Sequence, residues 1–317
     1  MILKIFWRLF SFFKRRISSR FFVIALPFTW VLLFFFIPFL LVLKISFSEL
    51  TVGIPPYLPI MERMGEDVIA FKLNIGNYFY LVWDDLYIRA ILNSLGLGAL
   101  ATIACLIIGF PMAYAIARAS LKYQTLLLMM VILPFWTSFL IRVYAWIGIL
   151  SYHGVVNTVL LKLGIIEAPL RLLNTIFSVS IGITYCYLPF MILPIYVSLQ
   201  KIDPSLLEAA YDLGSRPFRT FWKVTVPLSM PGIISGSLLV FIPSLGEFVI
   251  PDLLGGSDTL MIGRVLWNEF FVNRDWPVAG AVAIGMLVFL VFPIVLLQYI
   301  QKNVQRDQMG EGGQMNA

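Results

Sequence analysis

The sequence has little charge and almost no cysteine or histidine. Of its 317 residues, 13% are charged and 60% are hydrophobic, with a mean hydropathy of +0.91. Soluble domains carry about 25% charged residues, so this composition predicts a polytopic membrane protein. The two cysteines, Cys105 and Cys186, lie in apolar runs and are expected to be packing residues without a disulfide. His153 is the single histidine, which excludes a histidine-based metal site and a Ser/His/Asp triad.

The sequence also lacks a phosphate-binding loop. No segment matches the GxxxxGK[ST] pattern, in which backbone N–H groups and a lysine bind the phosphates of a nucleotide. We therefore expect no catalytic residues, no metal ligands and no cofactor in this chain. If ATP drives its activity, another protein must bind that ATP.

Six apolar windows are long enough to cross a hydrocarbon core of about 30 Å, which takes roughly 20 helical residues. They comprise residues 21–47, 91–117, 126–150, 176–199, 232–254 and 278–300. Lipid cannot satisfy exposed backbone groups, and the windows show no alternation with a period of two, so helices are expected. The predicted fold class is an all-α polytopic membrane protein with six transmembrane helices. The first window is too long for a signal-peptide core, and we expect it to be retained.

Lysine and arginine are distributed unequally between the two sides of these spans. Of the 23 Lys and Arg residues, 14 lie in the two tails, the 118–123 turn and the 200–229 loop, against seven in the opposite segments. Because basic segments stay in the cytoplasm, both termini and the 200–229 loop are expected there. The 48–90 segment then faces outward, and its WDDLY stretch predicts a short helix before the second span.

The 200–229 loop begins with the local signals of a short helix. Asp203 is typical of an N-cap and Pro204 of the first helical position, while Gly214 is typical of a left-handed helix end. A helix of about ten residues is too short to be stable alone in water, so it must pack against another surface.

The second half of the loop predicts a helix in the membrane interface. Pro217 restarts the chain, and the residues after it place aromatic side chains on one face and basic side chains on another. Pro227 and Pro231 are then expected to turn the chain into the fifth span.

The residues of this loop also match a known motif. Glu208, Ala209 and Ala210 are followed at fixed spacings by Gly214, Val224, Val226 and Pro227. The pattern resembles the EAA loop of permease subunits of binding-protein-dependent ABC importers, with valine at two positions where isoleucine and leucine are usual. In that family the loop is the coupling helix that sits in a groove of the cytoplasmic ATPase. The resemblance therefore implies an ATPase-coupling role for Glu208, Ala209, Ala210, Gly214 and Pro227, and a type I permease core.

Three further stretches, residues 134–150, 246–256 and 261–279, look like the polyamine branch of these permeases, which carries putrescine or spermidine and putrescine. The resemblance implies an inner-membrane subunit that moves a polyamine, with putrescine favoured, from a periplasmic binding protein to the cytoplasm. The implied partners are an ABC ATPase dimer that holds ATP and magnesium, a second homologous permease subunit and the periplasmic polyamine-binding protein. A nucleic-acid partner is not expected.

The resulting organisation has a basic cytoplasmic tail, a first span, an outer segment, a permease core with its coupling loop, and a second cytoplasmic tail. These parts comprise residues 1–20, 21–47, 48–90, 91–300 with the loop at 201–228, and 301–317.

One carboxylate lies deep in a predicted span. An ionisable group there costs several kcal/mol unless it is paired or hydrated. Glu247 follows Pro243 and Gly246, which are expected to break the fifth span beside it. Two interpretations remain open: an ion pair with Arg142, which a residue count along a continuous third span places at a similar depth, or a position facing the pathway that attracts a polycation.

Aromatic side chains are the other candidates for the substrate pathway, because their faces attract ammonium groups. The candidates are Trp136, Tyr144, Tyr185, Phe241 and Phe248, although each single aromatic is more often a packing residue. Asp252 and Asp258 lie near the outer end of the fifth span, where either loop solvation or docking of a binding protein could explain them.

Three alternative functions remain at this point. The same importer class could carry another small substrate, such as an anion or iron. A secondary transporter would need internal repeat symmetry and residues for a coupling ion, neither of which the sequence shows. A membrane scaffold would use the 201–228 loop to bind a signalling partner without transport.

Overall fold

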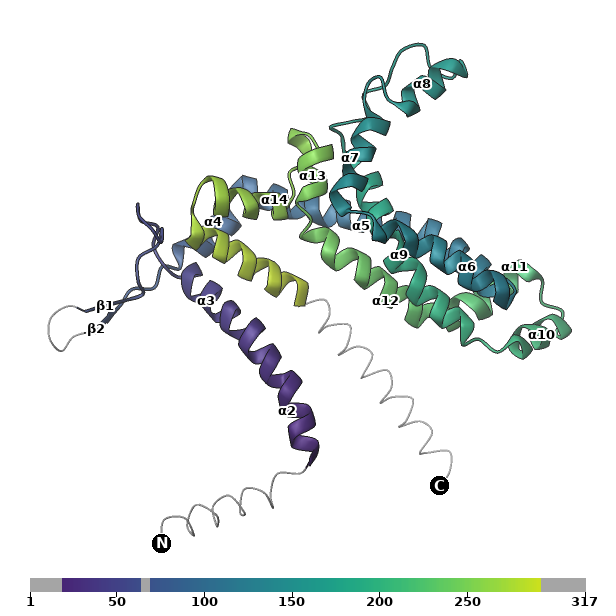
Figure 1. The fold of residues 1–317 in the computed structure, drawn as a ribbon, viewed down its shortest axis with the longest axis horizontal. Coiled ribbons are helices and arrows are strands. Elements are labelled where there is room, and N and C mark those ends of the chain that lie inside the picture. Colours follow the sequence, from purple (N-terminus) through teal and green to yellow (C-terminus); the bar gives the residue numbers. More distant parts are fainter. Residues whose placement is uncertain (1–18, 64–68, 292–317) are drawn as a thin grey trace, which may run out of the picture. The chain divides into compact units, whose positions relative to one another are not determined.

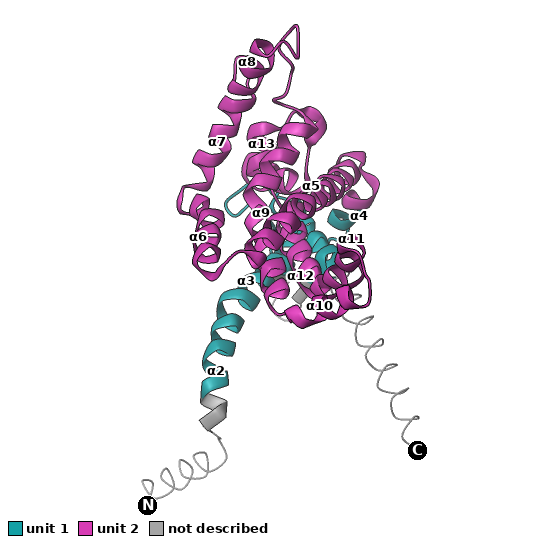
Figure 2. Ribbon diagram, turned by 90° about the vertical axis from the view of Figure 1, so that its right-hand side faces the viewer, with its two compact units in different colours: residues 1–79, 274–291 teal, residues 80–273, 292–317 magenta. Residues whose placement is uncertain are grey.

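The computed structural model describes residues 19–63 and 69–291. The chain divides into two compact units, shown in teal and magenta in Figure 2. Unit 1 comprises residues 1–79 and 274–291, and unit 2 comprises residues 80–273 and 292–317. Most of the predicted basic tail and the whole of the predicted 301–317 tail lie outside the described residues.

Unit 1 contains the first predicted span. α2 (Ser19–Val31), the π-helical segment η1 (Leu32–Phe36) and α3 (Ile37–Ser46) follow one another without interruption. Nearly all of their described side chains before Ile45 are at least partly exposed within this chain, in agreement with an apolar helix that meets lipid or another protein.

The outer segment of unit 1 departs from the all-α prediction by one small hairpin. β1 (Met61–Arg63) pairs antiparallel with β2 (Ile69–Phe71), with Glu62 opposite Ala70. α4 (Gly76–Trp83) follows and is fastened to the end of α3. The Asn77 amide donates hydrogen bonds of 2.9 Å to the carbonyls of Ser46 and Ser48, and the hydroxyls of Ser46 and Tyr78 lie 2.6 Å apart.

A short helix therefore precedes the second span, but the WDDLY stretch does not form it. Trp83 ends α4, and Asp84 is the N-cap of the long helix α5 (Asp85–Arg118), where its side chain accepts a hydrogen bond from the Leu86 N–H. The predicted position was wrong because Asp84 caps the following helix, and the acidic residues satisfy its first turn.

Three helices of unit 2 form its core: α5, α9 (Ile176–Gln200) and α12 (Val226–Leu245). Cys105, Met191 and Val240, one from each helix, are fully buried in the same cluster. Both cysteines are buried free thiols, which confirms the prediction that they are packing residues without a disulfide.

The third predicted span is not one helix. Residues 121–150 form α6 (Leu121–Ile132), the 3-10 turn η2 (Leu133–Trp136) and α7 (Phe139–Leu150), which is followed by α8 (Val155–Lys162). The prediction of a continuous helix over 126–150 was wrong because Pro134 lacks an N–H and its ring clashes with the preceding turn. Thr137 and Ser138 are extended there, so the chain changes direction before α7.

The fifth predicted span begins earlier than expected. The 201–228 loop forms α10 (Pro204–Asp212), α11 (Pro217–Thr220) and the π-helical segment η3 (Phe221–Thr225), which continues directly into α12. The expected turn at Pro227 and Pro231 was wrong. The π turn, with the Val226 N–H bonded to the Phe221 carbonyl, comes directly before Pro227 at the start of α12, whereas Pro231 lies inside the continuous helix.

The break that Pro243 and Gly246 predict is present. α12 ends at Leu245, and the chain resumes as α13 (Val249–Leu254), η4 (Ser257–Thr259), α14 (Ile262–Trp267) and the π-helical segment η5 (Asn268–Val272). Unit 1 then ends in a helix over Trp276–Val291, and the rest of the sixth predicted window, 292–300, lies outside the described residues.

Among the described residues, five helical stretches are long and apolar enough to cross a membrane. They are Val23–Ser46, Asp85–Arg118, Phe139–Lys162, Ile176–Gln200 and Pro217–Leu245. Two shorter apolar helices, Leu121–Trp136 and Trp276–Val291, accompany them.

Candidate functional site

The helix α10 lies at one end of α9 and α12, opposite the end that carries α13 (Figure 1). Its start follows the local signals in the sequence, because the Ser205 N–H donates a 3.0 Å hydrogen bond to the Asp203 carboxylate. This backbone bond lowers the pKa of Asp203. At the other end Gly214 has φ +77°, and its N–H bonds to the Tyr211 carbonyl.

α10 presents an exposed face at this end of unit 2. Leu207 is buried, whereas Glu208 and Ala209 are exposed. Tyr211 is half-exposed, and 89% of Leu213 is accessible. The exposed surface of α10 and its C-terminal end thus combines a carboxylate, a small side chain and two apolar side chains.

The chain after α10 is anchored to α5 by aromatic contacts. The ring of Phe221 meets Phe110 and Tyr114 edge-on, with centroids 5.5 and 5.9 Å apart. Thr220 and Thr225 on either side are buried. The chain that follows α10 is therefore packed against the core helix α5 of unit 2.

At the opposite end of α12, Glu247 lies in the helix break and is only 8% exposed. One carboxylate oxygen accepts a 2.7 Å hydrogen bond from the Tyr187 hydroxyl of α9. The other accepts from the N–H groups of Val249 (3.1 Å) and Ile250 (3.4 Å) at the start of α13. The carboxylate thus satisfies free backbone donors of a helix N-terminus and is held by a neighbouring helix.

The backbone of α14 approaches this break very closely. A Cβ on Gly263 would lie 2.4 Å from the Gly246 carbonyl oxygen and 2.8 Å from that of Glu247. A second contact supports the arrangement, because the rings of Phe248 and Trp267 are stacked with centroids 4.6 Å apart. The break and α14 therefore form one packed assembly.

Arg142 does not form the ion pair considered for Glu247. Its guanidinium carbon lies 4.9 Å from the ring centroid of Phe135 and 5.8 Å from that of Phe139, and its buried Nε has no hydrogen-bond partner. Counting residues along the third span placed Arg142 at the depth of Glu247, but that count assumed a continuous helix. The break before α7 removes this basis, and Tyr187 takes the place of the expected partner.

The predicted aromatic candidates do not gather in one place. Trp136 is 87% exposed at the end of η2, and Tyr144 is exposed on α7. Tyr185 meets Trp146 edge-on, while Phe241 lies beside Gly98 in the core. Of the five, only Phe248 is next to Glu247 in the chain.

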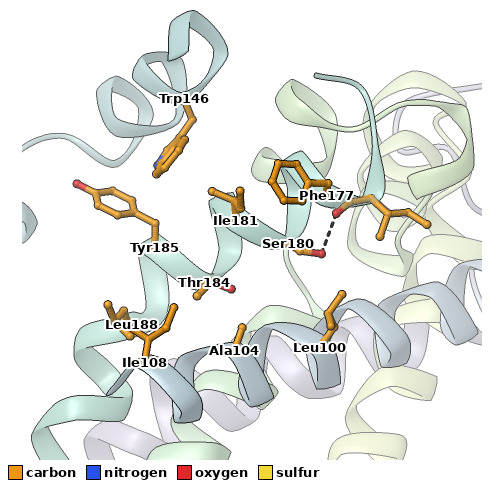
Figure 3. Close-up of a pocket in the computed structure, with 11 residues that line it drawn as sticks. Leu100, Ala104, Ile108, Trp146, Phe177, Ser180, Ile181, Thr184, Tyr185 and Leu188 are labelled. Atoms are coloured by element: carbon orange, nitrogen blue, oxygen red, sulfur yellow. Dashed lines mark hydrogen bonds between the residues drawn. The ribbon is translucent and has the colours of Figure 1, made fainter. Parts of the chain in front are cut away.

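A large cavity of unit 2 lies on another face, between α5, α7 and α9. Its volume is about 720 Å³, and Figure 3 shows its lining, which includes Ala104, Trp146, Ile181 and Tyr185. The dashed line in Figure 3 marks the hydrogen bond that the Ser180 hydroxyl donates to the Ile176 carbonyl. An apolar lining without a carboxylate is suited to hydrocarbon and not to a diamine.

The two outer aspartates have different surroundings. Asp252 lies 3.1 Å from the Nε of Arg264, so an ion pair between α13 and α14 accounts for it. Asp258 lines a cleft of about 760 Å³ together with Asp84, Asp85 and the exposed Arg89. This cleft has net acidic character at the end of unit 2 that the charge distribution predicts to face outward.

Sequence reasoning missed Tyr187 and Gly263. Tyr187 has no motif of its own, although it follows Tyr185 by two residues in an apolar span. Gly263 lies in the 261–279 stretch, which resembles polyamine permeases but carries no local signal for this glycine. Its tight contact depends on how the chain folds back over the break.

Comparisons with known proteins agree with this architecture. Residues 109–307 match the family described as binding-protein-dependent transport system inner membrane component. The chain is 43% identical over 283 residues to the spermidine/putrescine transport system permease protein PotB of Haemophilus influenzae, covering 89% of this chain and 94% of that protein. It is 40% identical over 270 residues to PotB of Escherichia coli K12, covering 85% and 92%.

The fold has a counterpart among solved structures. A bacterial alginate ABC transporter, in complex with an alginate pentasaccharide-bound periplasmic protein, contains a chain that matches with a TM-score of 0.67. The match covers 94% of this chain and 98% of that one at 20% identity, which indicates a shared fold.

Proposed function

The chain belongs to the family of binding-protein-dependent transport system inner membrane components, and from this premise we propose that it carries putrescine or spermidine across the bacterial inner membrane. It is a permease subunit of an ABC importer, a transport subunit and not an enzyme. The observation that carries the polyamine assignment is its identity of 40–43% to two spermidine/putrescine permeases over nearly the whole chain.

We further propose that α10 is the coupling helix. Its exposed Glu208, Ala209 and Leu213 would seat in a groove of a separate ATPase dimer, which supplies ATP and magnesium. The small side chain of Ala209 permits close approach, and the aromatic anchor at Phe221 would pass the movement on to α5 and α12. Alternating access would then follow from rocking of the packed spans.

Two other partners complete the proposal. A second homologous permease would contribute the other half of the pathway, and a periplasmic polyamine-binding protein would deliver the substrate. The acidic cleft around Asp258 would serve as the contact surface for the binding protein, because acidic groups complement basic side chains or cationic cargo. Both termini would lie in the cytoplasm, as the distribution of lysine and arginine favours.

The alternatives have less support. For an anion importer, the negative charge of the buried Glu247 carboxylate would repel the substrate, although the positive charge of Arg142 would attract it. A secondary transporter or a scaffold would not account for the family membership of the chain.

A transport assay with several cargoes tests the polyamine assignment. The complete importer in proteoliposomes is expected to take up radiolabelled putrescine and spermidine in an ATP-dependent manner, and to reject molybdate, sulfate and ferric ion. Uptake of anions alone would contradict the assignment, and uptake without ATP would contradict the importer class.

Replacing Glu247 with Gln tests the role of the buried charge. The substitution removes a negative charge while keeping the size of the side chain, so putrescine uptake is expected to fall about tenfold or more, the effect of losing roughly 1.4 kcal/mol. The amount of assembled complex should stay within about twofold of wild type. The control is Glu167→Gln, an exposed carboxylate of another loop, which should leave uptake unchanged. Equal loss of uptake and of assembled complex in Glu247→Gln would show that the carboxylate is structural only.

A further inference from the structure

The hydrogen bond between Tyr187 and Glu247 joins α9 to the break that follows α12. At their other ends, α9 and α12 are connected by the 201–228 loop. α9 runs from Tyr187 to Gln200 and enters the 201–228 loop, and the chain leaves this loop through α11, η3 and α12 to reach Glu247. At 1.5 Å per residue, Tyr187 lies about 20 Å from the loop end of α9. The bond therefore connects the two arms of this helical hairpin far from α10, as the course of α9 and α12 in Figure 1 shows.

Near the loop, these two arms are locked together. A Cβ on Gly232 of α12 would lie 2.6 Å from the Pro194 carbonyl oxygen and 2.5 Å from the Ser198 hydroxyl of α9. A Cβ on Gly236 would lie 2.9 Å from the Met191 sulfur. Such close packing does not deform gradually, so the loop halves of α9 and α12 move as one body.

Each arm contains two prolines in the interior of its helix. Pro194 and Pro231 lie in the closely packed loop halves. By contrast, Pro189 lies two residues after Tyr187, and Pro243 lies just before the break. Each proline removes one backbone hydrogen bond of its helix and favours bending there. Bending at Pro189 and Pro243 can therefore change the position of Tyr187 relative to the break while close packing holds the loop halves together.

The Tyr187–Glu247 bond joins α9 to the break itself, while further along the Ser178 hydroxyl of α9 donates a 2.7 Å hydrogen bond to the Leu254 carbonyl of α13. The Tyr187–Glu247 bond also occupies an oxygen of a carboxylate whose other oxygen already accepts two backbone N–H groups. Both oxygens of this carboxylate therefore have a partner, and only 8% of Glu247 is exposed, so access for a substrate is restricted in this conformation. Departure of the Tyr187 hydroxyl would free an acceptor site for an ammonium group.

We propose that Tyr187 is the positioning residue that holds the Glu247 carboxylate in the resting conformation, and that bending of α9 against the α12 break releases it to a cationic substrate. Movement of α10 would reach the pathway in this way. That the released carboxylate meets a polyamine rests on the proposed function. That the Tyr187–Glu247 bond stabilises the resting conformation does not depend on the substrate.

The substitution Tyr187→Phe removes only the hydroxyl. A hydrogen bond to a charged group is stronger than one between neutral groups, so its loss should shift the equilibrium away from the resting conformation about tenfold or more. In the complete importer in proteoliposomes, ATP hydrolysis without the binding protein is expected to rise by about that factor. Tyr123→Phe is the control, because it removes an exposed hydroxyl of α6 that forms no hydrogen bond with any described residue. This control should leave the basal rate unchanged.

A double-mutant cycle with Glu247→Gln shows whether the two side chains act through each other. In the Glu247→Gln background, Tyr187→Phe is expected to change basal hydrolysis by less than about twofold, because the charged acceptor is already gone. Additive effects, an unchanged basal rate in assembled Tyr187→Phe, or an equal rise in Tyr123→Phe would each overturn the proposal. If Tyr187→Phe does not assemble, Glu247→Gln tests the proposal alone. Loss of the acceptor must then raise basal ATP hydrolysis, and an unchanged rate overturns the proposal.

These measurements separate this proposal from the assigned function. Basal hydrolysis needs no cargo, so the result stands whatever substrate the cargo assay identifies. A wild-type complex that hydrolyses no ATP under any condition would instead contradict the importer class.

Discussion

The substitution Gly263→Ala is expected to reduce putrescine uptake about a hundredfold. The added Cβ would lie 2.4 Å from the Gly246 carbonyl oxygen and 2.8 Å from the Glu247 carbonyl oxygen. Both are backbone atoms, which cannot move aside by a change of rotamer. Overpacking of this kind destabilises a protein by about 1–3 kcal/mol. Here it would displace either α14 or the break that holds Glu247. Uptake by the complete importer, normalised to assembled complex, measures the effect.

A matched glycine in another helix provides the control. A Cβ on Gly96 of α5 meets nothing within 4 Å, so Gly96→Ala is expected to preserve uptake and to stabilise the helix slightly. Comparable losses in both variants would indicate a general sensitivity of the helices to alanine. Normal uptake in Gly263→Ala would show that the break does not need its close contact with α14.

The substitution Gly214→Val is expected to uncouple ATP hydrolysis from transport. Gly214 ends α10 with φ +77°, a conformation that costs a residue with a Cβ about 1–2 kcal/mol and a β-branched residue more. The helix end should unwind or reorient, which misplaces the exposed face of α10 against the ATPase. Uptake per ATP hydrolysed should fall about tenfold or more, while the protein remains in the membrane.

A second glycine separates backbone strain from position. Gly164 has φ +65°, and neither glycine has an atom within 4 Å of an added Cβ, so Gly164→Val imposes a comparable strain. Gly164 follows α8, far along the chain from α10, and this variant should keep its ratio of uptake to hydrolysis. Full coupling in Gly214→Val would rule out a coupling role for the end of α10. Replacing Glu208 with Lys should uncouple in the same direction by reversing the charge offered to the ATPase.

Local chemistry explains why the start and end of α10 were predicted closely. The Asp203 cap, the start at Pro204 and the left-handed Gly214 depend on neighbours within a few residues. The break near Glu247 was predictable for the same reason, since Pro243 and Gly246 act on their own helix. The continuation through Pro227 was not predictable, because a π turn upstream alters the local hydrogen-bonding pattern.

Contacts between distant residues were the weakest part of the prediction. The pairing of Arg142 with Glu247 rested on counting residues along two straight helices, and Pro134 and Pro243 bend or end both of them. A span composed almost wholly of apolar residues carries little information about which side chain faces which neighbour. Tyr187 and Trp146 therefore looked like ordinary membrane aromatics in the sequence.

The class of this protein, the approximate position of most spans, and the helical signals and motif of the loop that we assign to coupling can all be read from the amino-acid order. These features follow from composition and from short-range backbone chemistry, which act along the chain. The contacts of Tyr187 with Glu247, of Gly263 with the break and of Arg142 with aromatic rings become visible only in the folded molecule. Those contacts join segments up to about 60 residues apart, and close packing selects them only after the helices have bent at their prolines.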